Sequence, residues 1–270
     1  MKKSNTKPRK SVHGTQEWAA TNINIQSGCE HDCRYCYAKG NAVRFGRFKA
    51  SDWRKPVINE KQVSRNHRNR DGRIMFPSSH DITPSNIDSV IVVLKKLLAA
   101  GNHILIVSKP EPGCIKRICT ELADYRDQIL FRFTIGSRNN SVLKYWEPNA
   151  PSFEKRLSAL RWAYSKGFQT SVSAEPMLDT KIEKVIKAVR PYVTDAIWLG
   201  RANRLRVILS MTCPGDLAIQ QEAAKLLGLQ DYKWIHELYA KYRKDPMVRW
   251  KDSLKKIVGI ELPSEKGLDI

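Results

Sequence analysis

Apolar residues recur along this chain in two alternating patterns, short runs typical of strands and longer stretches with helical spacing. The strand-like runs lie at residues 21–26, 73–76, 103–107, 129–135, 169–174 and 196–200. Between them, apolar positions three or four residues apart predict amphipathic helices, as in residues 87–98 and 152–166. Strands that alternate with helices at this spacing lie parallel and are connected by right-handed crossovers. The pattern predicts an α/β fold, and a barrel and an open doubly wound sheet both satisfy it.

The same pattern divides the chain into a strand-rich core and a helical C-terminal part. We predict a basic tail at residues 1–20, the core at 21–213 and a helical extension at 214–270. The helices expected in the extension cover residues 216–227, 231–243 and about 250–258. Aromatic and basic residues alternate there, namely Trp234, Tyr239, Tyr242 and Trp250 with Lys233, Lys241, Arg243, Lys244, Arg249 and Lys251. They form either an aromatic core with a solvated basic face, or a second nucleic-acid surface or cap over the open side of the core.

Length and composition restrict the class of protein. A chain of 270 residues holds one large α/β domain with a small extension. No run of about 18 apolar residues occurs, so we expect no membrane span. The first ten residues are basic and lack an apolar stretch, unlike a signal peptide. Six cysteines, three of them close together, argue against a secreted disulfide framework and favour a reducing cytoplasm.

The charge of the chain is strongly positive. Forty-seven Lys and Arg residues against 27 Asp and Glu residues give a formal charge of +20. This excess indicates a polyanionic partner, and the alternative is a surface that serves solubility alone. A basic insertion at about residues 39–73 carries much of the excess, and its aromatic residues Phe45, Phe48 and Trp53 are candidates for stacking on bases. Nucleic acid is therefore the expected partner, DNA more than RNA.

Three cysteines, Cys29, Cys33 and Cys36, follow the first predicted strand at a C-x3-C-x2-C spacing. Thiolates are soft ligands that suit iron–sulfur clusters, zinc or copper(I). A cubane cluster normally takes four cysteines, so three imply a fourth ligand elsewhere or an iron left open. A structural zinc site with His31 or His13 as fourth ligand is the alternative. No second pair of ligands follows, however, and His31 lies only two residues from two of the cysteines.

This motif, with an aromatic residue before the last cysteine, resembles the signature of radical S-adenosylmethionine (SAM) enzymes. The resemblance implies that Cys29, Cys33 and Cys36 hold three irons of a [4Fe-4S] cluster, whose fourth iron binds SAM. In this family one electron, from a reductant such as flavodoxin or ferredoxin, cleaves SAM to a 5′-deoxyadenosyl radical that abstracts hydrogen from the substrate. The resemblance also implies a partial (βα)6 TIM-type barrel with its functional groups at the carboxyl ends of the strands.

Four further stretches are similar to the spore photoproduct lyase branch of this family, which repairs a thymine dimer in DNA. They lie at residues 76–82, 107–110, 147–152 with Arg156 and Leu157, and 173–179. The likeness covers about residues 21–205. It implies that the protein is an enzyme of the lyase or isomerase type that acts on a nucleobase.

The same resemblance assigns roles to individual residues. Ser78, Ser79 and Lys109 contact SAM in this assignment, Lys109 through the SAM carboxylate. Either Thr134 or Ser137 approaches its ribose. Tyr35 and Tyr37 flank the third cysteine and match tyrosines proposed to relay a hydrogen atom, while Glu175 orients the substrate or pairs with an arginine. The structural alternatives are helix capping for Ser78 and Ser79, a surface position for Lys109 and packing for the tyrosines.

One position departs from the lyase pattern. Ser78 stands where the lyases keep a hydrogen-donating cysteine, and a serine O–H bond is too strong to quench a carbon radical readily. Cys114 follows Lys109 closely and is the alternative donor. We therefore expect modification, rearrangement or repair of a base in nucleic acid. The alternatives are a radical SAM enzyme for a peptide or small molecule, and a non-catalytic nucleic-acid-binding protein with a structural metal.

Overall fold

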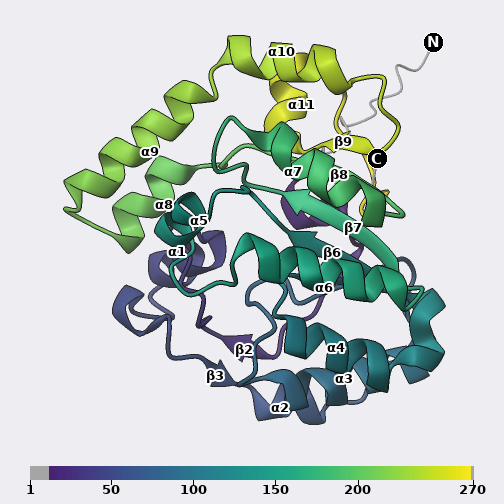
Figure 1. Cartoon of the computed structure of the whole chain (residues 1–270). Coiled ribbons are helices and arrows are strands. Elements are labelled where there is room, and N and C mark those ends of the chain that lie inside the picture. The colour runs from purple at the N-terminus through teal and green to yellow at the C-terminus, as the bar shows by residue number, and fades with distance from the viewer. Residues whose placement is uncertain (1–11, 269–270) are drawn as a thin grey trace, which may run out of the picture.

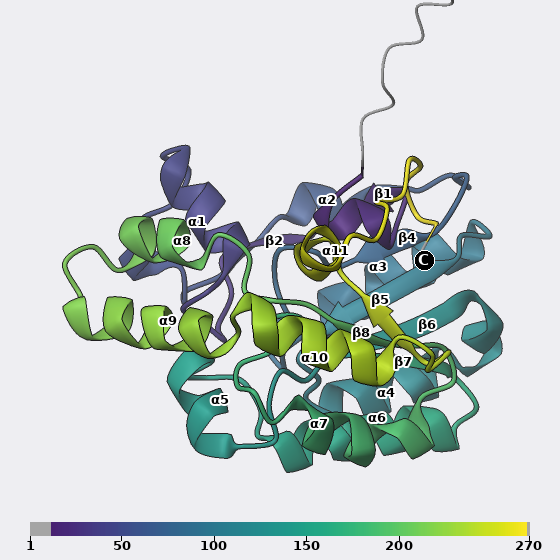
Figure 2. The same ribbon diagram turned by 90° about the horizontal axis from the view of Figure 1, so that it is seen from above.

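A computed structural model describes residues 12–268 and contains a curved, seven-stranded parallel sheet (Figures 1 and 2). Its strands, in spatial order, are β1 (Thr21–Asn22), β4 (Ile74–Phe76), β5 (Ile104–Ser108), β6 (Ile129–Thr134), β7 (Gln169–Ala174), β8 (Ile197–Leu199) and β9 (Val248–Trp250). All neighbouring strands pair in parallel. Among the described residues β1 and β9 are the two edges, so the sheet is an open, partial barrel. The α/β fold expected from the sequence is confirmed.

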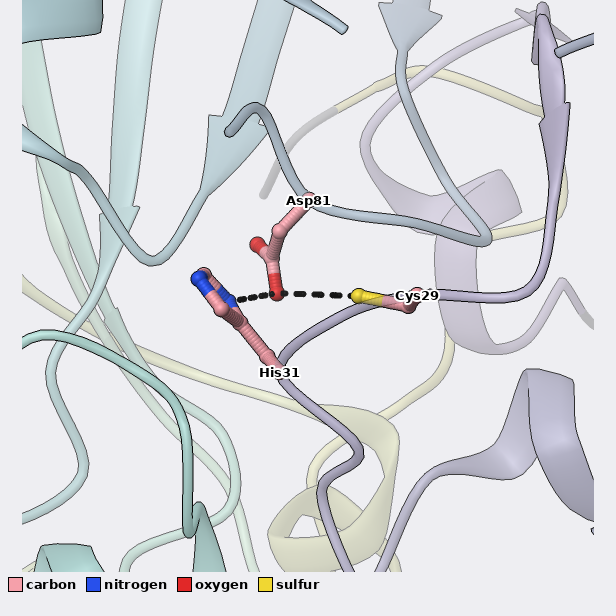
Figure 3. A group of neighbouring side chains, drawn as sticks. All are labelled: Cys29, His31 and Asp81. Atoms are coloured by element: carbon pink, nitrogen blue, oxygen red, sulfur yellow. Dashed lines mark hydrogen bonds and ion pairs between the residues drawn. The ribbon is translucent and has the colours of Figure 1, made fainter. Parts of the chain in front are cut away.

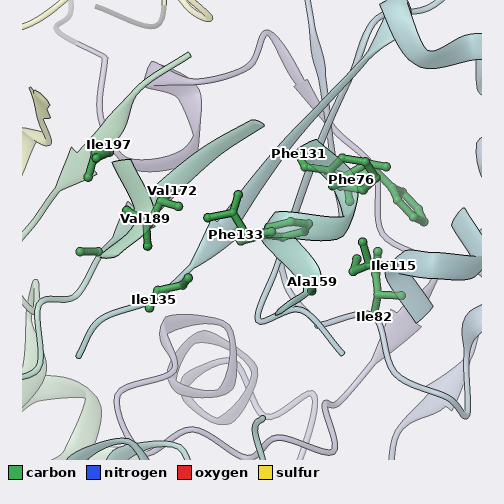
Figure 4. Packing of buried hydrophobic residues seen from close by; sticks show 14 of the residues in the cluster. Phe76, Ile82, Ile115, Phe131, Phe133, Ile135, Ala159, Val172, Val189 and Ile197 are labelled. Atoms are coloured by element: carbon green, nitrogen blue, oxygen red, sulfur yellow. The ribbon is translucent and has the colours of Figure 1, made fainter. Parts of the chain in front are cut away.

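Four crossover helices cover the outer face of the sheet. They are α3 (Ile87–Ala99), α4 (Pro112–Glu121), α6 (Phe153–Ser165) and α7 (Ile182–Val189), and Figure 1 shows α6 and α7 in front of the sheet with α3 and α4 below them. Each buries the apolar stripe that its spacing predicts, and α6 begins where the Ser152 hydroxyl caps the amide of Lys155. Outward-facing strand residues such as Phe131 and Phe133 pack against them (Figure 4). Hydrophobic burial between these layers is the main stabilising contribution.

The inner face of the sheet holds a second, smaller core. Leu130, Met75 and Trp198 point inward and pack with Trp18, whose ring meets Trp198 edge-on at a centroid distance of 5.7 Å. Trp18 comes from a segment that the sequence predicted to be a tail. That prediction is wrong for residues 12–20, since they include the 3-10 helix η1 (Gly14–Glu17) and plug the inside of the barrel. Residues 1–11 of the predicted tail lie outside the described residues.

The C-terminal part contains α8 (Leu205–Thr212), α9 (Leu217–Leu229), α10 (Tyr232–Tyr242) and α11 (Asp252–Val258). It is not purely helical, because residues 248–250 form strand β9 beside β8. Trp250 had been predicted to begin a helix. Trp250 packs against Tyr239 at 5.2 Å between ring centroids, as an aromatic core requires. Lys251 is buried, so it cannot belong to the proposed second nucleic-acid surface.

The basic insertion and the residues before it fold into short regular elements. They contain α1 (Tyr37–Arg44), η2 (Ala50–Asp52), β3 (Val57–Ile58), which pairs with β2 (Gln26–Ser27), and α2 (Glu60–Ser64). Trp53 is buried and Phe48 half-buried, so the prediction that they stack on bases is wrong for Trp53. Phe45 is 61% exposed and lies between the guanidinium groups of Arg44 and Arg47.

The remaining short elements are η3 (Ala123–Gln128), α5 (Asn140–Trp146) and η4 (Arg190–Tyr192). Across the described part of the chain, no helix combines the length and hydrophobicity needed to cross a lipid bilayer.

Candidate active site

A cavity of about 410 Å³ opens at the carboxyl ends of the strands. Cys29, Cys33 and Cys36 line it on one side. The segments that follow β4, β5, β6, β7 and β8 line the rest, together with Trp18 from the inner plug. In a parallel α/β fold this edge of the sheet is where functional groups collect.

The cysteine loop is held in place by its neighbours at both ends. At its start Gly28 has φ +84°, and a Cβ at this position would lie 2.7 Å from the carbonyl oxygen of Trp53. That carbonyl accepts a hydrogen bond from the amide of Cys29 at 2.8 Å. At its end Cys36 caps α1, where its Sγ accepts from the amide of Lys39 at 3.4 Å. A helix N-terminus stabilises a thiolate at this position.

The thiols of this loop are buried, and burial raises the pKa of Cys29 to about 12 and those of Cys33 and Cys36 above their ordinary value. A thiolate in such surroundings is favoured only next to a compensating cation. The loop is therefore suited to ligands that bring positive charge into the cavity.

Asp81, after β4, connects the cysteine loop to the rest of the site. Its Oδ2 lies 2.9 Å from Nδ1 of His31 and 4.0 Å from Sγ of Cys29 (Figure 3). Its Oδ1 accepts from the hydroxyl of Ser108 at 2.9 Å and from the amide of Lys109 at 2.7 Å. Burial alone raises the pKa of Asp81, but Lys109 and His31 outweigh it and hold this pKa well below its usual range. Asp81 was not predicted as a site residue, and His31 was predicted only as a possible ligand of the alternative zinc site.

These contacts argue against a zinc site built on the cysteines. Cys29, His31 and Asp81 are the group of possible metal ligands that the described residues bring together, without Cys33 and Cys36. A carboxylate has about four lone-pair sites, and protein donors already occupy those of Asp81. His13, the other expected zinc ligand, lies 3.7 Å from Asp252 instead.

Lys109 lies in the cavity wall, with its ammonium 3.3 Å from Oδ2 of Asp81 and 5.8 Å from the centre of the Tyr35 ring. Burial lowers the pKa of Lys109, but the charge of Asp81 opposes it and the net pKa stands well above the ordinary value. A cation is therefore fixed beside the cysteine loop.

Tyr35 is tied to a buried ion pair. Its hydroxyl donates to Glu147, whose other oxygen accepts from Arg156. Arg156 also donates to the carbonyl of Thr134 at 3.2 Å, at the end of β6. Both charged side chains are 0% exposed. The ion pair thus fixes the Tyr35 ring relative to the strand ends.

Ser78 and Ser79 line the cavity and are held by Asn24, a residue that no sequence pattern singles out. The Asn24 carboxamide accepts from the amides of both serines, at 2.7 and 2.9 Å, and donates to the Ser78 hydroxyl. Tyr37 also lines the cavity, and its hydroxyl donates to the Ser78 carbonyl. These polar contacts therefore hold the loop after β4 in place. They do not cap a following helix, which was the structural alternative for the two serines.

Glu175 lies after β7 and also lines the cavity. Its carboxylate is 3.7 Å from the ammonium of Lys251, which also pairs with Glu17 at 2.5 Å. Burial, opposed by Lys251, raises the pKa of Glu175 to about 7. It is a carboxyl group that can hold or release a proton near neutral pH.

The structure does not bring all predicted residues into this cavity. Thr134 lines it, but Ser137 is buried and donates to Asp179 at 2.5 Å. Cys114 is buried in α4, among the residues of the outer core. Neither Ser137 nor Cys114 is part of the cavity lining.

Residues 23–192 of the sequence match the family described as the radical SAM superfamily. The chain is also similar to the uncharacterized protein ORF301 of Acidianus two-tailed virus, with 25% identity over 183 residues. That similarity covers 63% of this chain and 59% of the viral protein, so this chain spans less than two thirds of its relative.

The fold is similar to solved structures of two kinds. Spore photoproduct lyase complexed with dinucleoside spore photoproduct has a TM-score of 0.52 and 17% identity, covering 91% of this chain and 79% of the lyase. A double mutant of that lyase with bound AdoMet and the dinucleoside has a TM-score of 0.54 and 16% identity, with the same coverage. SuiB of Streptococcus suis bound to precursor peptide SuiA has a TM-score of 0.52 and 11% identity, covering 92% of this chain and 54% of SuiB. At these identities the likeness concerns the fold alone.

Proposed function

Because this chain belongs to the radical SAM superfamily, we propose that it cleaves SAM reductively and abstracts hydrogen from a base in nucleic acid. The observation that carries the proposal is that the three motif cysteines line the same cavity as Lys109, at the carboxyl ends of the strands. The superfamily implies a [4Fe-4S] cluster and SAM as cofactors.

The residues of the cavity fit this pair of cofactors. Three soft sulfur donors on one loop suit three irons of a cluster. The fixed ammonium of Lys109 suits the carboxylate of SAM, and the hydroxyl groups of Ser78, Ser79 and Thr134 offer polar partners nearby. When bound, the cluster and SAM supply a carbon radical that abstracts hydrogen.

The remaining side chains position and shield the reacting groups. Trp18 and Met75 form an apolar part of the wall, which limits the access of water. The contact of Tyr35 with Glu147 and the contact of Tyr37 with Ser78 keep both phenols oriented at the cavity. We assign the relay of a hydrogen atom to these tyrosines rather than to Cys114, because only the tyrosines line the cavity. Glu175 is assigned to substrate orientation.

A nucleic-acid substrate is proposed from the charge of the chain and from the polar and aromatic residues at and near the cavity. The chain carries a net charge of +20, and Arg201, Arg204 and Asn41 line the cavity. Phe45 and its two neighbouring arginines follow α1 directly, so an exposed aromatic ring stands beside phosphate-binding groups. A base can enter the cavity only after it has flipped out of the stack of neighbouring bases.

The test is electron paramagnetic resonance on anaerobically purified, dithionite-reduced protein, with and without SAM. We expect a [4Fe-4S] signal that changes on addition of SAM and is lost in Cys36→Ala, whereas Cys119→Ala, a change in the outer core, keeps it. Stoichiometric zinc and no cluster signal would sink the proposal. Salt-dependent binding of DNA tests the substrate class, and binding of peptides without it would favour a peptide substrate.

A further inference from the structure

A second hollow, of about 620 Å³, lies between the loops that follow β6 and β7. Its lining consists of Arg138, Asn139, Asp179, Lys181, Lys184 and Lys187. Four of these side chains are cationic and one is anionic, which gives a local formal charge of +4 − 1 = +3. None of the roles assigned above uses this hollow.

The one carboxylate of the hollow is already occupied. Asp179 accepts from the Ser137 hydroxyl at 2.5 Å and from the amide of Lys181 at 2.7 Å. Ser137, one of the two residues that the family resemblance placed near the ribose of SAM, thus serves to fix this loop. Within residues 12–268, no ion pair at 4.0 Å or less joins a carboxylate to any of the three lysines or to Arg138. The charges of the three lysines are therefore available to an anionic ligand, while the guanidinium of Arg138 lies 5.7 Å from the centre of the Phe153 ring.

Helix α7 adds to the positive potential. Lys181 occupies its N-cap position and its side chain makes no hydrogen bond to the amides of the first turn. Aligned peptide dipoles place about half a positive charge at such a helix end. Phosphate groups suit a site with both features, because helix amides and Lys or Arg side chains donate to the same oxygens.

The hollow is fixed at a short distance from the reactive cavity. Both loops begin in the wall of that cavity, at Thr134 and Glu175. The amide of Leu178 bonds to the carbonyl of Gly136 at 2.9 Å and joins the loops. Four residues of extended chain, from Thr134 to Arg138, span at most about 14 Å. This is about four steps of a stacked strand at 3.4 Å per nucleotide.

We propose that this hollow binds backbone phosphates of the nucleic-acid strand whose base enters the reactive cavity. The inference rests on the proposed function and adds to it a second anchoring point besides the ring of Phe45. Two anchors on one strand would set which nucleotide faces the radical.

The test compares two triple variants of equal charge. Lys181→Gln, Lys184→Gln and Lys187→Gln remove the lysines of the hollow, all of them exposed. Lys95→Gln, Lys116→Gln and Lys166→Gln remove three exposed lysines on or next to the outer helices α3, α4 and α6. Binding of a labelled 20-nucleotide single-stranded DNA to cluster-loaded protein is followed by fluorescence anisotropy between 50 and 200 mM KCl.

Each phosphate contact contributes about 0.7 to the slope of log K against log salt for single strands. We expect the first triple variant to lower this slope by about 2, as for three lost contacts, and the control variant to leave it unchanged. Equal changes in both variants overturn the inference while leaving the proposed function intact. The inference is also overturned if wild-type protein binds poly-glutamate as tightly as DNA and the first triple variant loses both to the same extent. Wild-type protein that assembles the cluster and responds to SAM but binds no DNA also overturns it, whereas failure of the cluster test refutes the proposed function itself.

Discussion

The buried ion pair between Glu147 and Arg156 gives the sharpest test of how the site is held together. Replacing Arg156 by Met keeps most of the volume and removes the charge. It leaves the Glu147 carboxylate without its cation in surroundings where both side chains are 0% exposed. It also deprives the carbonyls of Thr134 and Pro151 of their donors at 3.2 and 2.8 Å.

Breaking a buried pair by removing one partner costs about 3–5 kcal/mol, because an uncompensated charge stays buried. We therefore expect Arg156→Met to lower the free energy of unfolding by about 3–5 kcal/mol. The assay is urea unfolding of the reduced, cluster-free protein, followed by circular dichroism and tryptophan fluorescence.

Two further variants make the result interpretable. Arg161→Met changes an exposed arginine on the same helix and is expected to cost less than about 1 kcal/mol. Glu147→Gln combined with Arg156→Met removes both charges and should recover part of the loss, as a double-mutant cycle measures. If Arg156→Met lowers the free energy of unfolding no more than Arg161→Met does, the ion pair does not hold Tyr35 and the end of β6 in place.

Three other outcomes follow from the site. Gly28→Ala should destabilise the fold by about 1–3 kcal/mol and lower the iron content of the protein. The φ of Gly28 is +84°, and the added Cβ would lie 2.7 Å from the Trp53 carbonyl oxygen. An unchanged iron content and an unchanged midpoint of urea unfolding would contradict this. Glu175→Gln should flatten the dependence of stability on pH. With a folded pKa of about 7 against 4.5, the folded state keeps a proton that the unfolded state releases, so stability is highest below pH 4.5 and falls by about 3 kcal/mol as pH rises to 7. The variant should thus gain stability at pH 8 and not at pH 4, and equal shifts at both would refute the sign. Lys109→Gln should weaken SAM binding about 10–100-fold in equilibrium dialysis, as expected for one charge-assisted hydrogen bond, and unchanged binding would remove Lys109 from the cofactor site.

The repeating layers of the fold could be predicted from the sequence because they follow from local periodicity. The helix predicted over residues 152–166 is observed at Phe153–Ser165, and all six predicted strands occur. Strand β9 could not be predicted, since three residues become a strand only by pairing with β8. The inner plug was missed for a similar reason, because Trp18 and Glu17 find their partners far along the chain.

The chemistry of the site was predictable where it lies within one short motif. The cysteines and their tyrosines occur within nine residues, and Lys109, Ser79 and Glu175 follow strands that the pattern locates. Asp81 and Asn24 act through contacts that span about fifty residues of sequence, which no local pattern reveals. Trp53 was misjudged because its charged neighbours are exposed while its own ring is enclosed by the cysteine loop.

The contact of Lys251 with the inner plug also bears on the order in which the chain assembles. Its ammonium bonds to the carbonyl of Gly14 at 2.8 Å and pairs with Glu17, across 237 residues of sequence. A nascent chain cannot bury Glu17 with its partner until Lys251 has left the ribosome, about 10–50 s later at 5–20 residues per second. Thr15, Trp18 and Asp252 of this region form one wall of the reactive cavity. During translation that wall is therefore completed late, long after the cysteine loop has been synthesised.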